Sequence, residues 1–466
     1  MPFLVGEGLK VVSHSLVHLR DVPMIKKIVL GLLLLVALGL VGLNSIGITP
    51  AFIVYGPGVA SGIGAKLLCS AEYVIGSERD QAFEDLVQYS PILSQISVRY
   101  DDADKAVTSS LFGMKEKTAS FIPGLGCAVD YANYPQRSRL IVQQDEASSA
   151  PWPAGSAVGG IDPELQALLE TLLEHDNSRG LNTRALLLVH GGEIKAEAYG
   201  QGMTSESKLL GWSMAKSLNA IMLGNLEMRG FLNLSDGPGF PQWSADARSA
   251  ITSIALLTMT DGLDFSEDYN PGDDATAMLF TSPSSSDYVL ERPLSADPGA
   301  RFNYSSGTAN LLSRLYTDTL GGPQAAYDNY RQQIFKPMGF QHAVFETDAS
   351  GVFMGSSYFY ASARDWARMG QLMLNGGVLN GHRLVTEAWI ARATSPNQSE
   401  NDKAYGYQWW LNRGNESLRF PELPEDVYYA NGNRQQLVMV FPSQQAVIVR
   451  LGWTSGRYPV ADNFAR

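Results

Sequence analysis

The stretch GWSMAKSLNA, residues 211–220, places the hydroxyl of Ser213 three positions before the amine of Lys216. Positions i and i+3 of a helix lie on one face, so Lys216 can reach the serine oxygen. Ala215 and Leu218 favour a buried helix, and burial lowers the pKa of a lysine, which leaves some free amine to act as a base. The backbone N–H of Ser213, at the start of the helix, can bind an oxyanion. The stretch therefore predicts a nucleophilic serine.

A lone S-x-x-K spacing is common in proteins and is weak evidence by itself. Three further stretches support its interpretation as a catalytic motif. They are ITSIALLTMTDGLDFSEDY (251–269), PGARFNYSSGTANLLSRL (298–315) and DASGVFMGSSYFYASARDWARMG (348–370). Together they resemble the penicillin-binding and class C β-lactamase superfamily of serine hydrolases, in the branch of 6-aminohexanoate-dimer hydrolases and family VIII esterases. The resemblance covers roughly residues 160–460. It implies an α+β, β-lactamase/transpeptidase-like fold, with an antiparallel sheet flanked by helices and an inserted helical domain.

The same resemblance assigns further site residues. Tyr304 stands where the family has its tyrosine, and we expect its phenol, held partly ionised by Lys216, to shuttle the proton to the leaving group. Ser306 stands where β-lactamases have an asparagine that contacts the amide side chain. The intact Ser213, Lys216 and Tyr304 imply an acyl-enzyme mechanism that needs no cofactor and no metal.

A third motif, K-T-G or H-x-G in the superfamily, is expected just before an apolar strand. We align Asn433, Arg434 and Gln435 with it, which makes the N–H of Gln436 the second oxyanion donor. A register shifted to Asn431-Gly432-Asn433 is the alternative. Arg434 can bind a substrate carboxylate. Trp409 and Trp410 either line an acyl pocket or belong to the core.

The chain divides into segments of different composition. Residues 143–160, rich in Ala, Ser, Gly and Pro, predict a linker between a small region (50–142) and a hydrolase domain (161–466). Asp162 and Pro163 predict the start of an amphipathic helix. Strand-like runs at about 180–200 and 405–453 predict one antiparallel sheet, with the helical block between them. The chain stops where the family continues into a terminal helix.

An apolar run from Ile28 to Ile48 follows Lys26 and Lys27. Its length suits a transmembrane helix, and the basic flank keeps the N-terminal side in the cytoplasm. Residues 24–49 are therefore predicted to be an anchor or a signal segment, preceded by a cytoplasmic stub (1–23) or by an upstream extension of a protein that starts at Met24. The predicted location is the bacterial inner membrane with a periplasmic catalytic domain, or the periplasm if the segment is cleaved.

The two cysteines, Cys69 and Cys127, both follow this segment, in a compartment where thiols oxidise, so we expect them to pair. Two separate buried thiols are the alternative, and a lipidated Cys69 fits the surrounding sequence less well.

The composition excludes some classes of function. With 35 Lys and Arg against 47 Asp and Glu, the net charge of −12 and the lack of a basic cluster argue against nucleic acid binding. Gly58, Gly62 and Gly64 mimic a dinucleotide loop, but no βαβ unit follows them. The histidines have no metal-binding spacing; they are His14, His18, His175, His190, His342 and His382.

We therefore expect a serine hydrolase that cleaves an ester or a small amide through an acyl-enzyme. Two alternatives remain. One is a β-lactamase or D-alanyl-D-alanine carboxypeptidase, and the other is a protein that binds cell-wall peptides without turnover. The partners expected are a small ester, amide or peptide-like substrate and the membrane. The oligomeric state, the natural substrate and the role of residues 50–142 do not follow from the sequence.

Overall fold

The computed structural model describes residues 26, 28–32, 49–143 and 147–465. The chain forms two units, Met1–Val54 and Tyr55–Arg466. The predicted cytoplasmic stub lies outside the described residues, as does most of the predicted membrane segment 24–49. Among the described residues, one helix, Ala51–Ile75, is long and apolar enough to cross a membrane, and 67% of its apolar window is buried within the fold. A core helix that is mostly buried also has this length and apolar composition.

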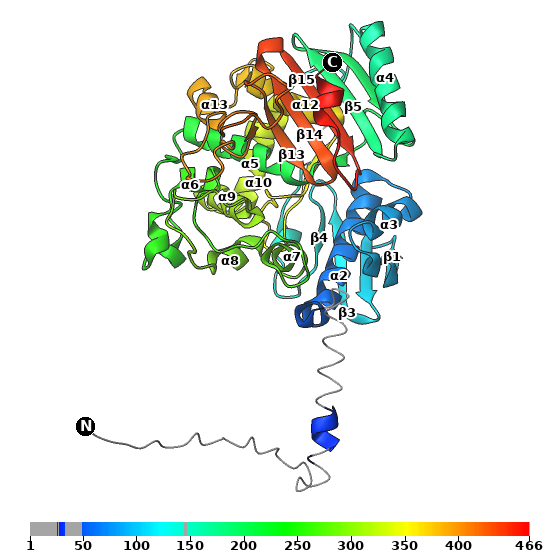
Figure 1. The fold of residues 1–466 in the computed structure, drawn as a ribbon, viewed down its shortest axis with the longest axis vertical. Coiled ribbons are helices and arrows are strands. Elements are labelled where there is room, and N and C mark those ends of the chain that lie inside the picture. Colours follow the sequence, from blue (N-terminus) through cyan, green and yellow to red (C-terminus); the bar gives the residue numbers. More distant parts are fainter. Residues whose placement is uncertain (1–25, 27, 33–48, 144–146, 466) are drawn as a thin grey trace, which may run out of the picture. The chain divides into compact units, whose positions relative to one another are not determined.

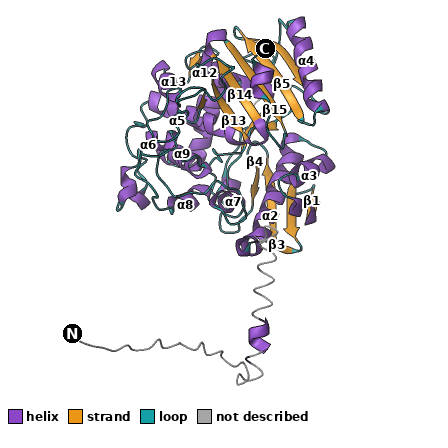
Figure 2. Ribbon diagram, viewed as in Figure 1, coloured by secondary structure: helices purple, strands orange, loops and turns teal. Residues whose placement is uncertain are grey.

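A six-stranded antiparallel sheet forms one layer of the larger unit (Figures 1 and 2). Its order is β12 (Trp410–Leu411), β13 (Tyr428–Gly432), β14 (Gln436–Phe441), β15 (Ala446–Gly452), β5 (Thr183–His190) and β6 (Glu193–Tyr199). Its strands come from the two regions of sequence predicted to form it. The prediction of an antiparallel sheet in an α+β fold is therefore confirmed.

Alternation along β5 explains why helices cover both faces of the sheet. Leu186 packs with Leu173 of α4 (Pro163–Ser178), whereas its neighbour Leu187 faces the main core. On that core side lies α12 (Ala363–Leu374), whose Gly370 lies so close to β14 and β15 that a Cβ would meet Val438 and Val447. Asp162 caps α4 as predicted, accepting hydrogen bonds from two backbone N–H groups.

The helical block is inserted between β6 and β12. Its helices are α5 (Ala215–Met228), α6 (Ser253–Leu257), α7 (Asp274–Phe280), α8 (Ser285–Leu290), α9 (Ser306–Thr319), α10 (Pro323–Tyr330), α11 (Lys336–Met338) and α13 (Glu387–Ala393). The same region contributes a small sheet ordered β7 (Leu209–Leu210), β9 (Phe359–Ala361) and β8 (Ala343–Phe345), and a two-stranded ribbon of β10 (Val378–Leu379) and β11 (His382–Arg383). A short helix, α14 (Val460–Phe464), follows β15.

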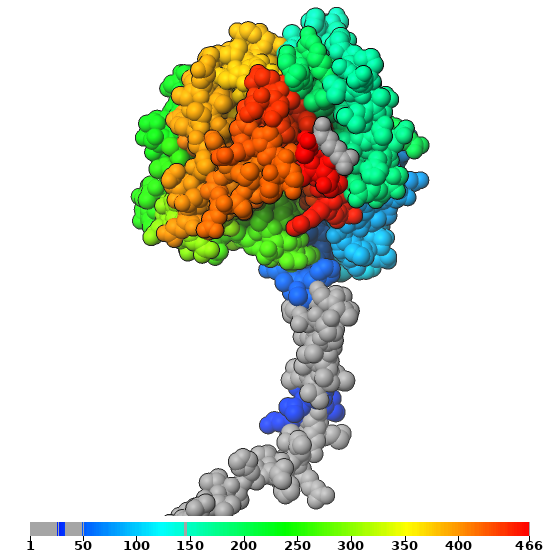
Figure 3. Space-filling view, turned by 45° about the horizontal axis from the view of Figure 1, so that its top comes forward, coloured from blue at the N-terminus to red at the C-terminus, as the bar shows by residue number. Residues whose placement is uncertain are grey.

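Residues 55–142 fold against this body. They contain most of α2 (Pro50–Ser70), α3 (Arg79–Val87) and a four-stranded sheet of β1 (Ile96–Asp101), β2 (Ala106–Leu111), β3 (Met114–Ile122) and β4 (Gly126–Val129). The structure joins Cys69 to Cys127 in a disulfide, with 6.0 Å between the Cα atoms. Figure 3 shows the blue atoms of this region directly against the green and red atoms of later residues.

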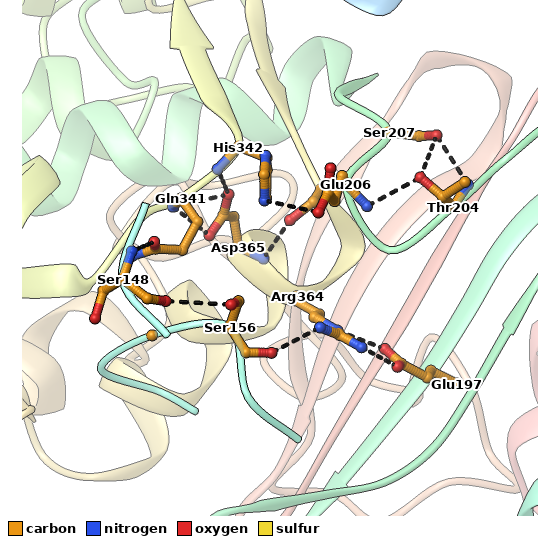
Figure 4. Close-up of polar contacts among 12 residues, drawn as sticks. Ser148, Ser156, Glu197, Thr204, Glu206, Ser207, Gln341, His342, Arg364 and Asp365 are labelled. Carbon is orange, nitrogen blue, oxygen red and sulfur yellow. Dashed lines mark hydrogen bonds and ion pairs between the residues drawn. The ribbon is translucent and has the colours of Figure 1, made fainter. Parts of the chain in front are cut away.

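The segment predicted as a linker, residues 143–160, is bound to the body by polar contacts (Figure 4). The N–H of Ser148 donates to Oε1 of Gln341 at 2.6 Å, and Nη1 of Arg364 donates to the carbonyl of Ser156 at 2.9 Å. Arg364 also forms an ion pair with Glu197 of β6. These contacts hold the described part of the segment within the larger unit.

Candidate active site

Ser213 lies on a short 3-10 turn, Trp212–Met214, between β7 and α5. The preceding residue, Trp212, has a positive φ of 49°, which is strained for a residue with a large side chain. Gly211 and Gly432 are both required by close packing: a Cβ on Gly432 would lie 2.0 Å from the carbonyl oxygen of Gly211. The turn that carries the serine is therefore fixed against the end of β13.

Lys216 is 1% exposed and lies in the first turn of α5. Its Nζ has three oxygen partners: Oγ of Ser213 at 2.9 Å, Oγ of Ser306 at 3.1 Å and the carbonyl of Ser356 at 2.9 Å. Burial lowers the pKa of Lys216 to about 8, although the charge of Glu267 opposes the shift. At neutral pH about a tenth of such a lysine is a free amine. The structure thus brings the predicted serine and lysine together.

Glu267 is a site residue that the sequence analysis missed. It accepts hydrogen bonds from the backbone N–H of Ser306 (2.7 Å), from the Ser306 hydroxyl and from the hydroxyl of Tyr269 (2.7 Å). The Ser306 hydroxyl in turn accepts the bond from Lys216. Glu267 therefore reaches the lysine through one serine. The stretch 251–269 ends in DFSEDY, which contains Glu267 among other acidic residues. This acidic run was the signal in the sequence that could have pointed to Glu267.

Tyr304 stands just before Ser305, the N-cap residue of α9, and lies beside the same lysine. The Nζ of Lys216 lies 4.9 Å from the centre of the Tyr304 ring, and Ser213 is close enough to the phenol to affect its pKa. Burial raises the pKa of Tyr304 above its usual value; the neighbouring Ser213 hydroxyl lowers it, and the charge of Glu267 raises it further. The phenol therefore keeps its proton at neutral pH. This corrects the expectation of a partly ionised phenol, because the effect of desolvation on the pKa exceeds the lowering effect of Ser213.

The two tryptophans predicted together separate. Trp410 stacks on Tyr304, with ring centres 5.3 Å apart, and Tyr405 packs on its edge at 4.7 Å. Trp409 is fully buried and packs against Tyr428. Trp410 therefore belongs to the wall beside the tyrosine, and Trp409 to the core.

Asn433, Arg434 and Gln435 form the turn between β13 and β14, with positive φ at Arg434 (61°) and Gln435 (66°). The Arg434 guanidinium lies 4.2 Å from the centre of the Tyr89 ring. Gln435 lines a surface groove together with Trp410, Asn431 and Arg457. Carboxylate binding by Arg434 stays a prediction, since its side chain packs on an aromatic ring.

Gln436 begins β14, an internal strand between β13 and β15, and its side chain bonds both backbone groups of Gly452. Its predicted role as an oxyanion donor is untested. By contrast, the end of β13 lies next to the nucleophile turn through the Gly432–Gly211 approach. This contact favours the alternative register, Asn431-Gly432-Asn433. Within the described ranges, no three His, Cys, Asp or Glu side chains group as metal ligands.

Comparisons with known proteins agree with this geometry. A family model described as Beta-lactamase matches residues 165–464. A 6-aminohexanoate-dimer hydrolase from Paenarthrobacter ureafaciens is 26% identical over 261 residues, which cover 50% of this chain and 65% of that protein. The match thus spans slightly less than two thirds of that relative.

Two solved structures share the fold. One is a family VIII carboxylesterase (TM-score 0.52, 13% identity, covering 66% of this chain and 96% of that chain). The other is a class C beta-lactamase (TM-score 0.51, 13% identity, covering 65% and 94%). The resemblance inferred from the motifs is confirmed, and because the family model matches more than half of the chain, this protein belongs to the beta-lactamase family.

Proposed function

We propose that this protein is a serine hydrolase that cleaves an ester or a small amide through an acyl-enzyme. The observation that carries the proposal is the 2.9 Å contact between Nζ of Lys216 and Oγ of Ser213, made by a buried lysine whose pKa is lowered to about 8. A serine hydroxyl becomes a nucleophile when a base takes its proton, and a lysine with this pKa supplies one near neutral pH.

Hydrogen bonding directs the lone pair of that lysine. A neutral amine has two N–H groups and one lone pair. The Ser356 carbonyl can only accept a hydrogen bond, and the Ser306 hydroxyl must accept because its own proton goes to Glu267. The two N–H groups of Lys216 are therefore occupied, and the lone pair points to Ser213. Glu267 thus serves as a positioning residue that acts through Ser306.

The reaction then follows from these positions. Ser213 Oγ bonds to the substrate carbonyl carbon while its proton passes to Lys216. The resulting oxyanion is held by the N–H of Ser213 and by an N–H at the end of β13 or at Gln436. The protonated phenol of Tyr304 gives its proton to the departing oxygen or nitrogen and is reprotonated by Lys216. Water then attacks the acyl-enzyme and releases the acid.

We place the enzyme at the membrane. The uncharged run Ile28–Ile48 is long enough to cross a bilayer, and Lys26 and Lys27 precede it. The disulfide between Cys69 and Cys127 is consistent with an oxidising compartment such as the periplasm. Both features support an inner-membrane anchor with a periplasmic hydrolase domain, or a periplasmic enzyme if the segment is cleaved.

Turnover by the purified full-length chain tests the substrate class. Short-chain nitrophenyl esters, nitroanilide amides and a chromogenic cephalosporin are compared with the Ser213→Ala variant as background. We expect Ser213-dependent hydrolysis of the esters or amides to exceed that of the cephalosporin. Faster cephalosporin turnover would support the β-lactamase alternative, and failure of Ser213 to form any acyl-enzyme would support a binding protein.

A further inference from the structure

Residues 55–142 lie outside the segment matched by the family model, yet two of their contacts lead to the catalytic side chains. The first contact is aromatic. Tyr89 packs edge-on against Trp212, with ring centres 5.9 Å apart, and Trp212 is the strained residue directly before Ser213. The guanidinium of Arg434 lies over the Tyr89 ring, so the ring is packed by Arg434 as well as by Trp212. Tyr89 therefore supports the backbone that presents the nucleophile.

The second contact is a fully buried polar cluster around Glu346. Its Oε2 forms an ion pair with Lys66 of α2. Its Oε1 accepts hydrogen bonds from the hydroxyl of Ser70 (2.9 Å) and from the N–H of Cys127 (2.7 Å). Ser70 directly follows Cys69, which forms the disulfide with Cys127. Residue 126 is a glycine, and a Cβ at this position would lie only 2.3 Å from the Glu346 carboxylate. The chain at both ends of the disulfide is thus hydrogen-bonded to this one carboxylate.

Glu346 also closes the loop that holds the lysine's third partner. Its N–H donates to the carbonyl of Tyr358, and its carbonyl accepts from the N–H of Met354, both at 2.9 Å. Between these two bonds lies Ser356, whose carbonyl accepts from Lys216 at 2.9 Å. Lys66 additionally lies 4.0 Å from the centre of the Tyr358 ring, which itself packs on Trp212 at 5.9 Å.

We infer that residues 55–142, which contain the disulfide, are a positioning element of the active site. Tyr89 holds the Trp212–Ser213 turn, and the hydrogen bonds from Ser70 and Cys127 hold Glu346 and with it the carbonyl of Ser356. The inference rests on the proposed serine hydrolase. It assigns the segment a role in catalysis besides tethering, because a displacement of about 1 Å at a reacting group costs up to a hundredfold in rate.

The aromatic contact is tested with three variants of the full-length chain. Tyr89→Leu removes the ring, Tyr89→Phe keeps it, and Tyr100→Leu makes the same truncation on β1, where the ring stacks on Arg79 instead. The second-order rate of labelling by a fluorophosphonate is measured well below the unfolding temperature. We expect Tyr89→Leu to label about tenfold or more slowly, with the other two within about twofold of the parent.

The contacts of Glu346 are tested with double variants that replace both Lys66 and Glu346, so that neither charge is left buried without its partner. Lys66→Met with Glu346→Gln keeps an oxygen that accepts from Ser70 and Cys127, whereas Lys66→Met with Glu346→Ala removes it. We expect the first pair to label at close to the parental rate and the second about tenfold more slowly. Hydrogen exchange of peptides covering residues 211–217 and 354–358 gives a readout independent of activity, and it should show lost protection in the two slow variants.

The outcomes separate the two claims. Parental labelling and parental exchange in folded Tyr89→Leu and Lys66→Met/Glu346→Ala would overturn the positioning role. Equal slowing in Tyr100→Leu would also overturn it, because the effect would then be general destabilisation. A parent that is not labelled at Ser213 contradicts the proposed hydrolase instead, and the exchange data then decide the positioning claim alone.

Discussion

The Oγ of Ser306 lies 3.1 Å from the Nζ of Lys216, at the position where β-lactamases carry an asparagine. An asparagine oxygen can only accept a hydrogen bond, whereas a serine hydroxyl can accept or donate. In this protein the Ser306 proton is committed to Glu267, which makes the serine an acceptor. The pair Ser306 and Glu267 thus presents to Lys216 an oxygen that accepts a hydrogen bond, as an amide oxygen would.

This exchange predicts a specific double-mutant cycle. Glu267→Gln should slow acylation of Ser213 about tenfold, because the amide that replaces the carboxylate can donate to Ser306 and release its proton toward Lys216. In a Ser306→Asn background the same change should cost less than about twofold. We expect a coupling energy of about 1 kcal/mol, measured from the labelling rates. Equal effects in both backgrounds would show that Glu267 does not act through Ser306.

The pH dependence of acylation should report the lysine. With the pKa of Lys216 lowered to about 8, the acylation rate should rise about tenfold per pH unit below that value and level off above it. Because the charge of Glu267 raises this pKa, Glu267→Gln should move the midpoint to lower pH. A midpoint above about pH 10, as for an exposed lysine, would contradict a buried base.

The buried lysine should also reduce stability at neutral pH. Its pKa is about 8 in the fold and about 10.5 in the unfolded chain, so the unfolded state binds more protons between these values and stability rises with pH there. At pH 7 the full cost is present. Lys216→Met should therefore lose labelling yet gain up to about 3 kcal/mol in unfolding free energy, less the hydrogen bonds it removes. The gain should shrink at pH 10; an equal gain at both pH values would exclude this origin.

The protonated phenol of Tyr304 predicts a dependence on the leaving group. Tyr304→Phe should slow the cleavage of an alkyl ester or amide at least about a hundredfold, because the departing atom needs a proton. Labelling by a fluorophosphonate, whose fluoride leaves readily, should fall by less than about tenfold. Tyr405→Phe, a neighbouring buried tyrosine, is the matched control. Equal losses for good and poor leaving groups would argue against a proton donor.

The parts of the site that the sequence predicted are those encoded locally or by motif. Ser213 and Lys216 lie one helical turn apart, so their contact follows from spacing alone. Tyr304 was placed by its motif. The sheet followed from strand-like runs in two separate regions of the sequence, which are visible without knowledge of their pairing.

The remaining parts depend on contacts between distant residues. Ser356 is 140 positions from Lys216, and only the folded loop closed by Glu346 brings its carbonyl to the amine. The Arg434 side chain could not be oriented from sequence, because its partner Tyr89 comes from a region without a motif. Likewise, the ionisation of Tyr304 depended on a burial that composition does not reveal.

The whole mechanism depends on Ser213 being an activated nucleophile. We would examine this by intact-protein mass spectrometry of the full-length chain in detergent after exposure to a fluorophosphonate, beside the Ser213→Ala variant. We expect one covalent adduct on the parent, mapped to the peptide that contains Ser213, and none on the variant. No adduct on a folded parent, or an equal adduct on both proteins, would refute the assignment of Ser213 as the nucleophile.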